Sequence, residues 1–297
     1  MNRISQTAIA AAILSSILFA LIYLYGIWMH PVSGTAVYAW RVVGMAVILW
    51  SVILFTRNWQ PIFLTLARLG KKWHLWAALL LTSAIFASQM WLFVWGAVNG
   101  YGIDIAIGYF LFPMVMVAVA RVVFHERLNR LQWLAVLFAA AGVAVQIWHS
   151  KTFSWVTAWT AGTYPIYYAV RRSMHISAFN GLFIDITLML PFALAFLWAS
   201  GHWGIPVPAA KYWLLLPTLG LISAVALYTN LYAAFNLPVA LFGMFSYLEP
   251  TLLFLLAITV LGMPVQAEDL WTYLLLGTGI ILMLSNNYLR LKSNKAA

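Results

Sequence analysis

In GYFLFPMVMVAVARVVFHERLNRLQWLAVLFAAAGV, residues 108–143, Pro113 interrupts a long apolar run. Pro250 does the same in FSYLEPTLLFLLAITVLGMPVQAEDLWTYLLLGTGI, residues 245–280. A proline inside a helix removes a backbone donor and clashes with the preceding turn, so it kinks or breaks the helix. In a membrane, the freed backbone groups are tolerated only inside protein or beside a cavity. Breaks at corresponding positions of two halves therefore indicate a transport site.

The composition indicates which solvent the chain is built for. Of its 297 residues, 65% are hydrophobic and only 7% are charged, whereas soluble domains carry about 25% charged residues. So much apolar surface cannot be hidden from water, and we expect the lipid bilayer to surround the chain. The net charge is +10, but Lys and Arg occupy short gaps between apolar runs. That pattern is typical of membrane topology and argues against a nucleic-acid partner.

No metal, cofactor or catalytic set is predicted. The chain has no cysteine, which excludes disulfides and cysteine metal sites. Its six histidines lie at or near predicted loops without metal-ligand spacing. No phosphate-binding glycine motif occurs, so transport driven by the chain's own ATP hydrolysis is not expected.

Ten apolar segments each have roughly the 17–25 residues that a membrane helix needs. They are 7–29, 36–55, 74–98, 103–124, 131–148, 154–171, 178–199, 212–235, 239–262 and 269–289. The first has no convincing cleavage site and is expected to be a retained helix rather than a signal peptide. The gaps, including the longest at 56–73 and 200–211, are expected to be loops.

The basic residues predict the orientation. Nearly all Lys and Arg fall in one alternate set of gaps, whereas the opposite set holds Lys151 and Lys211. Because positive residues stay on the cytoplasmic side, both termini are expected in the cytoplasm. We expect a multi-pass protein of the bacterial inner membrane, for which a monomer is plausible and the oligomeric state stays open.

A shift of 137 residues superposes Pro113 on Pro250 and Gly142 on Gly279. Together with ten spans, it predicts two related five-helix halves, 1–150 and 151–297, within one membrane domain. Since five is odd, the halves would be inserted in opposite directions. The expected fold class is therefore all-α integral membrane, with ten transmembrane helices as two inverted five-helix repeats.

Several motifs resemble one transporter family. HERLNRLQWLAVLFAAAGV (125–143) resembles the end of the EamA-type repeat of the drug/metabolite transporter (DMT) superfamily. Further motifs, in their order, resemble its RarD branch: WLFVWGAVNG (91–100), IGYFLFP (107–113), YYAVRR (167–172), GLFIDITLMLP (181–191) and LPVALFGMFSYLEPTLLFLLA (237–257). The resemblance covers nearly the whole chain. It implies a transporter with a central cavity between the halves.

The chain departs from that branch near the expected cavity. Gln89 precedes Met90-Trp91 where the branch usually has an Asn–Trp pair. Phe112 stands where Asn usually precedes the proline of the fourth helix, and Glu249 stands where an acid is usually absent. The resemblance, which includes an association with chloramphenicol sensitivity, therefore transfers no particular substrate.

Glu249 is the sharpest candidate for function. If the ninth span enters near Pro238, Glu249 lies about 16 Å deep at ~1.5 Å per residue, close to the middle of the bilayer. An intramembrane carboxylate is costly and indicates function by default. It would bind a cationic or amino group, or exchange a proton. The structural alternative is a protonated carboxyl bonded to a neighbouring helix.

Two other charged residues fall inside predicted spans. Asp185 lies about 10 Å deep and either pairs with Arg171 or Arg172 or contacts substrate. Arg41 either extends to the interface or faces inward as an anion partner; the span-like residues around it favour the inward orientation. Glu126, in the basic turn after the fourth span, is expected to form an ion pair or a helix cap.

The remaining candidates are polar or aromatic side chains deep in spans, where they would line a cavity, bridge helices or simply pack. They are Gln89, Trp91, Tyr109, Phe112, Tyr168, Asn230 and Tyr247.

These observations predict a secondary transporter of a small metabolite or drug-like solute that works by alternating access, with protons as a candidate coupling ion. The alternative is an uncoupled permease or an exporter of amino-acid-like metabolites. An intramembrane enzyme using Glu249 or Asp185 as a base lacks an accompanying nucleophile or metal set. A receptor would need signalling loops or domains that the sequence does not offer.

Overall fold

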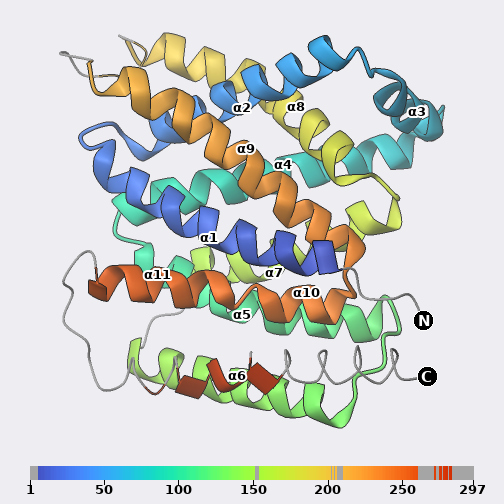
Figure 1. Cartoon of the computed structure of the whole chain (residues 1–297), viewed down its shortest axis with the longest axis vertical. Coiled ribbons are helices and arrows are strands. Elements are labelled where there is room, and N and C mark those ends of the chain that lie inside the picture. The colour runs from blue at the N-terminus through green and yellow to red at the C-terminus, as the bar shows by residue number, and fades with distance from the viewer. Residues whose placement is uncertain are drawn as a thin grey trace. The chain divides into compact units, whose positions relative to one another are not determined.

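The computed structural model describes residues 6–150, 154–201, 203, 205 and 210–259, and a few positions from 271 to 282. All regular elements within these residues are helices (Figure 1). They are α1 (Gln6–Trp28), α2 (Gly34–Thr56), α3 (Gln60–Leu69), α4 (Trp73–Val98), α5 (Gly102–Val122), α6 (Arg130–Ser150), α7 (Trp155–Ser173), α8 (Ala178–Ala199), α9 (Tyr212–Asn236), α10 (Val239–Phe245) and α11 (Leu248–Thr259).

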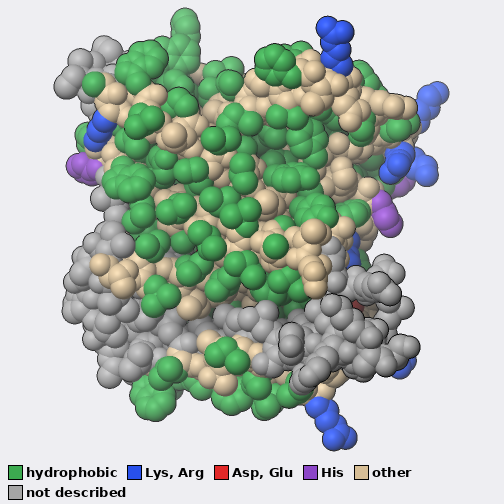
Figure 2. All heavy atoms as spheres, viewed as in Figure 1, with side chains coloured by type: hydrophobic (Ala, Val, Ile, Leu, Met, Phe, Trp, Pro, Cys, Tyr) green, Lys and Arg blue, Asp and Glu red, His purple; other side chains and the backbone are tan. Residues whose placement is uncertain are grey.

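Six of the described helices are long and apolar enough to cross a membrane, namely Gln6–Tyr25, Gly34–Thr56, Trp73–Gly96, Asp104–Val122, Ala178–Ala199 and Tyr212–Asn236. Large apolar side chains cover much of the face that Figure 2 shows, and Lys and Arg project at its edges. Trp213 is 82% exposed and Phe192 is 79% exposed, which suits contact with lipid. The chain is therefore a multi-pass integral membrane protein of the all-α class.

The predicted count of ten spans is not reached within the described residues. The predicted span 131–148 corresponds to α6, whose apolar part, Arg130–Val145, is shorter than a full span. The predicted span 154–171 corresponds to α7, which is less apolar. Most of the predicted span 269–289 lies outside the described residues. The ten-helix inverted repeat stays a prediction.

The expectation that 56–73 is a loop was wrong, because α3 occupies most of it. Proline at the start of this helix needs no amide partner there. Ile62, Thr65 and Leu69 are buried at helical spacing. With 10 residues, α3 is too short to be recognised as a membrane-spanning run in the sequence.

The described contacts divide the chain into two compact units that do not follow the predicted halves. Unit 1 combines Met1–Ala20, Ile103–Pro165 and Asn236–Ala297. Unit 2 combines Leu21–Gly102 and Ile166–Phe235. Each unit thus draws on both the first and the second half of the sequence.

Small residues let helices approach closely inside unit 2. A Cβ on Gly44 of α2 would lie 2.8 Å from the Cα of Gly220 in α9, closer than real Cβ contacts. Such small-residue contacts are typical of helix packing in membranes, where van der Waals fit replaces the hydrophobic drive.

The two prolines behave differently. Pro113 lies inside α5, which continues to Val122, so the break expected there is absent. The helix that contains Pro250 is interrupted between Phe245 and Leu248. Pro250 is the third residue of α11, so its missing N–H removes no hydrogen bond from within that helix. A proline alone does not determine whether a helix is interrupted, because the helices α7, α8 and α9 continue through internal prolines.

Candidate functional site

The interruption between α10 and α11 is the first element of the candidate site. The amide of Ser246 donates to the carbonyl oxygens of Phe242 and Gly243, at 3.1 and 3.2 Å, and thereby closes α10 with a tight turn. The Tyr247 carbonyl accepts from the Thr251 amide at 3.3 Å, which starts the next helix. Because Pro250 has no N–H, the Ser246 carbonyl loses its regular helical donor.

A carboxyl and a hydroxyl lie at this interruption. Glu249 is in the first turn of α11 and is partly buried. A helix N-terminus carries partial positive charge, so it is where a carboxylate is best stabilised inside a span. Tyr247 is 0% exposed, and its hydroxyl has no hydrogen-bond partner among the described residues. The interruption therefore places an acid two positions after a buried hydroxyl that is unpartnered within the described part of the chain.

The helix α5 packs against α10 within unit 1. A Cβ on Gly243 would lie 2.9 Å from the Met116 Cβ and 3.2 Å from the Pro113 carbonyl oxygen. The Phe112 ring, 4% exposed, lies 5.6 Å from the ring of Tyr164. Tyr109 is partly buried on the same helix. The proline of α5 thus sits against α10, just before its interruption.

Glu126 holds the beginning of α10. Its Oε1 accepts from the Val239 amide at 2.7 Å, and its Oε2 accepts from the Ala240 amide at 3.0 Å. The first amides of a helix lack partners within the helix, so one carboxylate satisfies two of them. Of the two roles expected for Glu126, the structure has the helix cap.

Asp185 lies at the centre of a buried polar cluster in unit 2. Its side chain is 0% exposed and pairs with Arg171. It also accepts from the Ser83 hydroxyl at 2.6 Å and from the Tyr167 hydroxyl at 3.0 Å. The sequence named Arg171 or Arg172 as the partner. It did not indicate Tyr167 of α7, or Ser83, which α4 contributes from 102 positions away.

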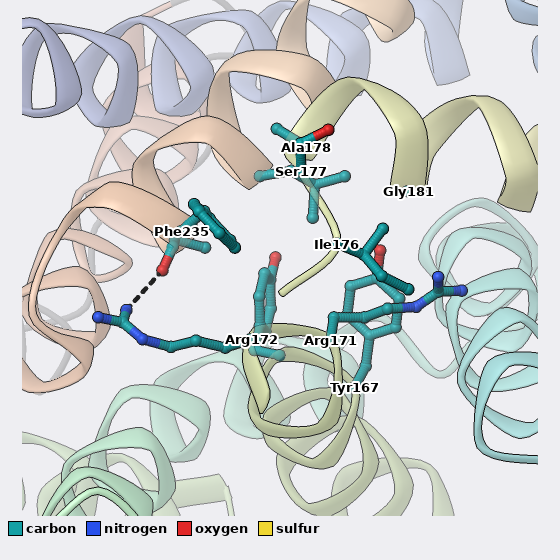
Figure 3. Close-up of a pocket in the computed structure, with 11 residues that line it drawn as sticks. Tyr167, Arg171, Arg172, Ile176, Ser177, Ala178, Gly181 and Phe235 are labelled. Carbon is teal, nitrogen blue, oxygen red and sulfur yellow. Dashed lines mark hydrogen bonds between the residues drawn. The ribbon is translucent and has the colours of Figure 1, made fainter. Parts of the chain in front are cut away.

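The second arginine, Arg172, contacts α9, whereas Arg171 pairs with Asp185. Arg172 donates to the Ala234 carbonyl at the end of α9, at 2.9 Å, drawn as a dashed line in Figure 3. Next to it, the Tyr168 hydroxyl donates to Asn230 Oδ1 at 2.6 Å, so these two candidates do meet. The small cavity between the ends of α7, α8 and α9 holds about 30 Å³. That volume suits a water molecule or two rather than a solute.

The other candidates of unit 2 lie on α2 and α4. Arg41 is 2% exposed and faces inward, where its Nε donates to the Ser223 hydroxyl at 3.1 Å. Gln89 is 1% exposed. Trp91 donates to the Thr35 hydroxyl at 3.1 Å. Neither Ser223 nor Thr35 was singled out from the sequence.

The candidates thus divide between the units. Glu249, Tyr247, Phe112 and Tyr109 belong to unit 1; Asp185, Arg41, Gln89, Trp91, Tyr168 and Asn230 belong to unit 2.

Known proteins related to this chain are named either transporter or RarD. No protein-family model matches it. A protein of Haemophilus influenzae named "Uncharacterized transporter" is 39% identical over 283 residues, covering 95% of this chain and 94% of that protein. The "Chloramphenicol-sensitive protein RarD" of Pseudomonas aeruginosa is 38% identical over 272 residues, 91% of each chain. "Protein RarD" of Escherichia coli is 32% identical over 201 residues, 66% of this chain and 67% of that protein.

A solved crystal structure shares the fold. It has a TM-score of 0.68 and 16% sequence identity, and the match covers 95% of this chain and 99% of that chain. Membrane-length helices, together with relatives named transporter and RarD that match over most of their length, identify this chain as a membrane transporter. It belongs to the RarD-like drug/metabolite transporter family.

Proposed function

We propose that the chain is a secondary transporter that moves a small metabolite or drug-like solute across the bacterial inner membrane by alternating access. The observation that carries the proposal is the interrupted helix α10–α11 with Glu249 in the first turn after the interruption. Interrupted helices supply solute and ion sites in transporters, because their freed backbone groups and helix ends point into the protein.

Glu249 is the proposed coupling or binding group. A carboxylate inside a span is costly and marks a functional site by default. The α11 N-terminus lowers that cost. Two positions earlier in the chain, the Tyr247 hydroxyl has no hydrogen-bond partner among the described residues. A cationic or amino group of the solute, or a proton, is the chemistry that suits such a carboxylate.

We assign Asp185 a structural role rather than a role in binding the solute. Its two oxygens already accept from Ser83, Tyr167 and Arg171. A compensated buried ion pair of this kind offers a solute no free acceptor. It fixes α4, α7 and α8 relative to one another instead.

The proposed orientation rests on the charges of unit 2. One end of its helices carries Arg57, Arg68, Lys71, Lys72, Arg171 and Arg172. The Asn180 side chain joins α8 to α3 at this end. At the other end, Lys211 donates to the His30 carbonyl at 2.8 Å. By the positive-inside rule, the arginine-rich end of unit 2 would face the cytoplasm. The cytoplasmic location of both termini rests on the distribution of Lys and Arg in the sequence.

Flux into proteoliposomes tests the function. The solute panel spans amino-acid-like metabolites and, because one relative is named chloramphenicol-sensitive, chloramphenicol. We expect specific, saturable flux of at least one solute, driven by an imposed pH gradient. Flux that ignores the pH gradient would support the uncoupled permease, and product formed without flux would support an enzyme.

The variant Glu249→Gln separates coupling from binding. If Glu249 exchanges the proton, the variant loses pH-driven uptake and keeps solute exchange between two loaded compartments. If it binds the solute, both activities fall. Normal pH-driven uptake in the variant contradicts either role of Glu249.

A further inference from the structure

The short helix α3 has features that the transport proposal leaves unused. It has 10 residues, so at 1.5 Å per residue it is about 15 Å long and cannot cross a bilayer. The chain enters it after Arg57, whose φ is 52°, and leaves it through Gly70, whose φ is also 52°. These left-handed positions turn the chain sharply out of α2 and into α4.

One face of α3 is fixed to the rest of unit 2. Asn180 Nδ2 donates to the Thr65 hydroxyl at 2.8 Å and to the Pro61 carbonyl at 3.0 Å. Leu69 packs in an apolar cluster with Leu79 and Ile184. The helix is therefore held against α4 and α8 on this side.

The opposite face is apolar and exposed. Phe63 is 64% exposed and Leu64 is 51% exposed. Two large side chains in the flanking segments are exposed still further, Phe55 at 89% and Trp73 at 79%. Exposed apolar surface of this kind indicates a membrane or partner contact.

The charge around α3 has one sign. Arg57, Arg68, Lys71 and Lys72 are all exposed, and the sequence has no Asp or Glu before Asp104. Lys and Arg side chains gather in Figure 2 at the edge of the molecule where Figure 1 places α3. A basic rim around an apolar face complements a surface of anionic lipid headgroups.

We propose that α3 lies in the plane of the membrane surface and binds anionic phospholipids. Phe63 and Leu64 enter the boundary between headgroups and acyl chains, and the four basic side chains contact the lipid phosphates. This lipid site is separate from the proposed solute site, and it does not depend on what the protein transports.

Because the chain has no cysteine, single cysteines report on the proposed contact. Phe63→Cys and Leu64→Cys are labelled with an environment-sensitive fluorophore in nanodiscs of phosphatidylcholine with phosphatidylglycerol. We expect blue-shifted emission that shallow spin-labelled lipids quench. Asn99→Cys, exposed at the far end of α4, is the control and should report water. A water-like signal at positions 63 and 64 would overturn the proposal. It would indicate instead that this face of α3 binds a soluble protein.

The headgroup requirement is tested by removing charge. The combined variant Arg57→Gln, Arg68→Gln, Lys71→Gln and Lys72→Gln should lose its preference for phosphatidylglycerol over phosphatidylcholine, by about fivefold for each charge removed. Lys211→Gln, at the other end of unit 2, should leave the preference unchanged. An unchanged preference in the combined variant overturns the phosphate contacts.

Inorganic phosphate distinguishes a lipid site from a general phosphate site. We expect that it does not reproduce the blue shift at Phe63→Cys when added to the protein in neutral nanodiscs. The same shift with inorganic phosphate would overturn the assignment to lipid.

Discussion

Asp185 and Arg171 form an ion pair in which the acid is wholly buried and the arginine side chain is 7% exposed. Ser83 completes a triangle with them, since Arg171 Nη2 donates to its hydroxyl at 2.9 Å and this hydroxyl donates to Asp185. The helices α4, α7 and α8 thus meet at one carboxylate.

Asp185→Asn should destabilise the protein by about 3–5 kcal/mol, because it leaves a buried guanidinium without its counter-charge. Thermal unfolding of the purified protein in detergent measures the loss. The double variant Asp185→Leu, Arg171→Leu should lose less than the sum of the two single variants. Additive losses would contradict the pairing.

Glu126→Gln should lower the unfolding temperature, with a cost of about 1–2 kcal/mol, because an amide offers one acceptor where the carboxylate serves two backbone amides. Asn129→Ala is the comparison. It removes the bond that Asn129 Oδ1 accepts from the Gln132 amide at the start of α6 and leaves α10 intact. Hydrogen exchange at the start of α10 should rise for Glu126→Gln alone; equal exchange in both variants would count against the cap.

Gly243→Ala should be destabilising, because the new methyl group would lie 2.9 Å from the Met116 Cβ and 3.2 Å from the Pro113 carbonyl oxygen. Gly162→Ala provides the matched control, since nothing lies within 4 Å of its added Cβ. That control should gain up to about 1 kcal/mol from helix propensity. Melting curves of the two variants should therefore move in opposite directions.

Tyr247→Phe should leave the unfolding temperature unchanged or raise it, because it removes a buried hydroxyl that has no partner among the described residues. Flux through the same variant should fall if this hydroxyl binds solute. Tyr167→Phe is the contrast. It removes the 3.0 Å bond to Asp185 and should cost about 1.5–3 kcal/mol, the range for a bond to a charged group. A Tyr247→Phe variant with normal flux would remove this hydroxyl from the site.

Apolar run length predicted most of the helices. The predicted segments 178–199 and 212–235 agree with α8 (Ala178–Ala199) and α9 (Tyr212–Asn236) almost to the residue. Two features of the fold do not follow from the length of an apolar run. The helix α3 is too short to register, and α10 and α11 were merged into one segment.

Proline chemistry located the interruption near Pro250 but gave the same expectation for Pro113, where α5 continues. The difference depends on tertiary packing and on the place of each proline within its helix. The sequence also named Asp185 together with two adjacent arginines. Only the rotation of α7 decides that Arg171 faces the acid and Arg172 faces the end of α9.

The cap of Glu126 on α10 also constrains the order of synthesis. The capping carboxylate and the Val239 amide are 113 positions apart in the chain, so at 5–20 residues per second the ribosome needs about 5–20 s to supply the partner. During that interval the Glu126 carboxylate lacks its backbone partners in α10. Unit 1, assembled from three chain segments, is thus completed late in translation, and its maturation is an event of the finished polypeptide.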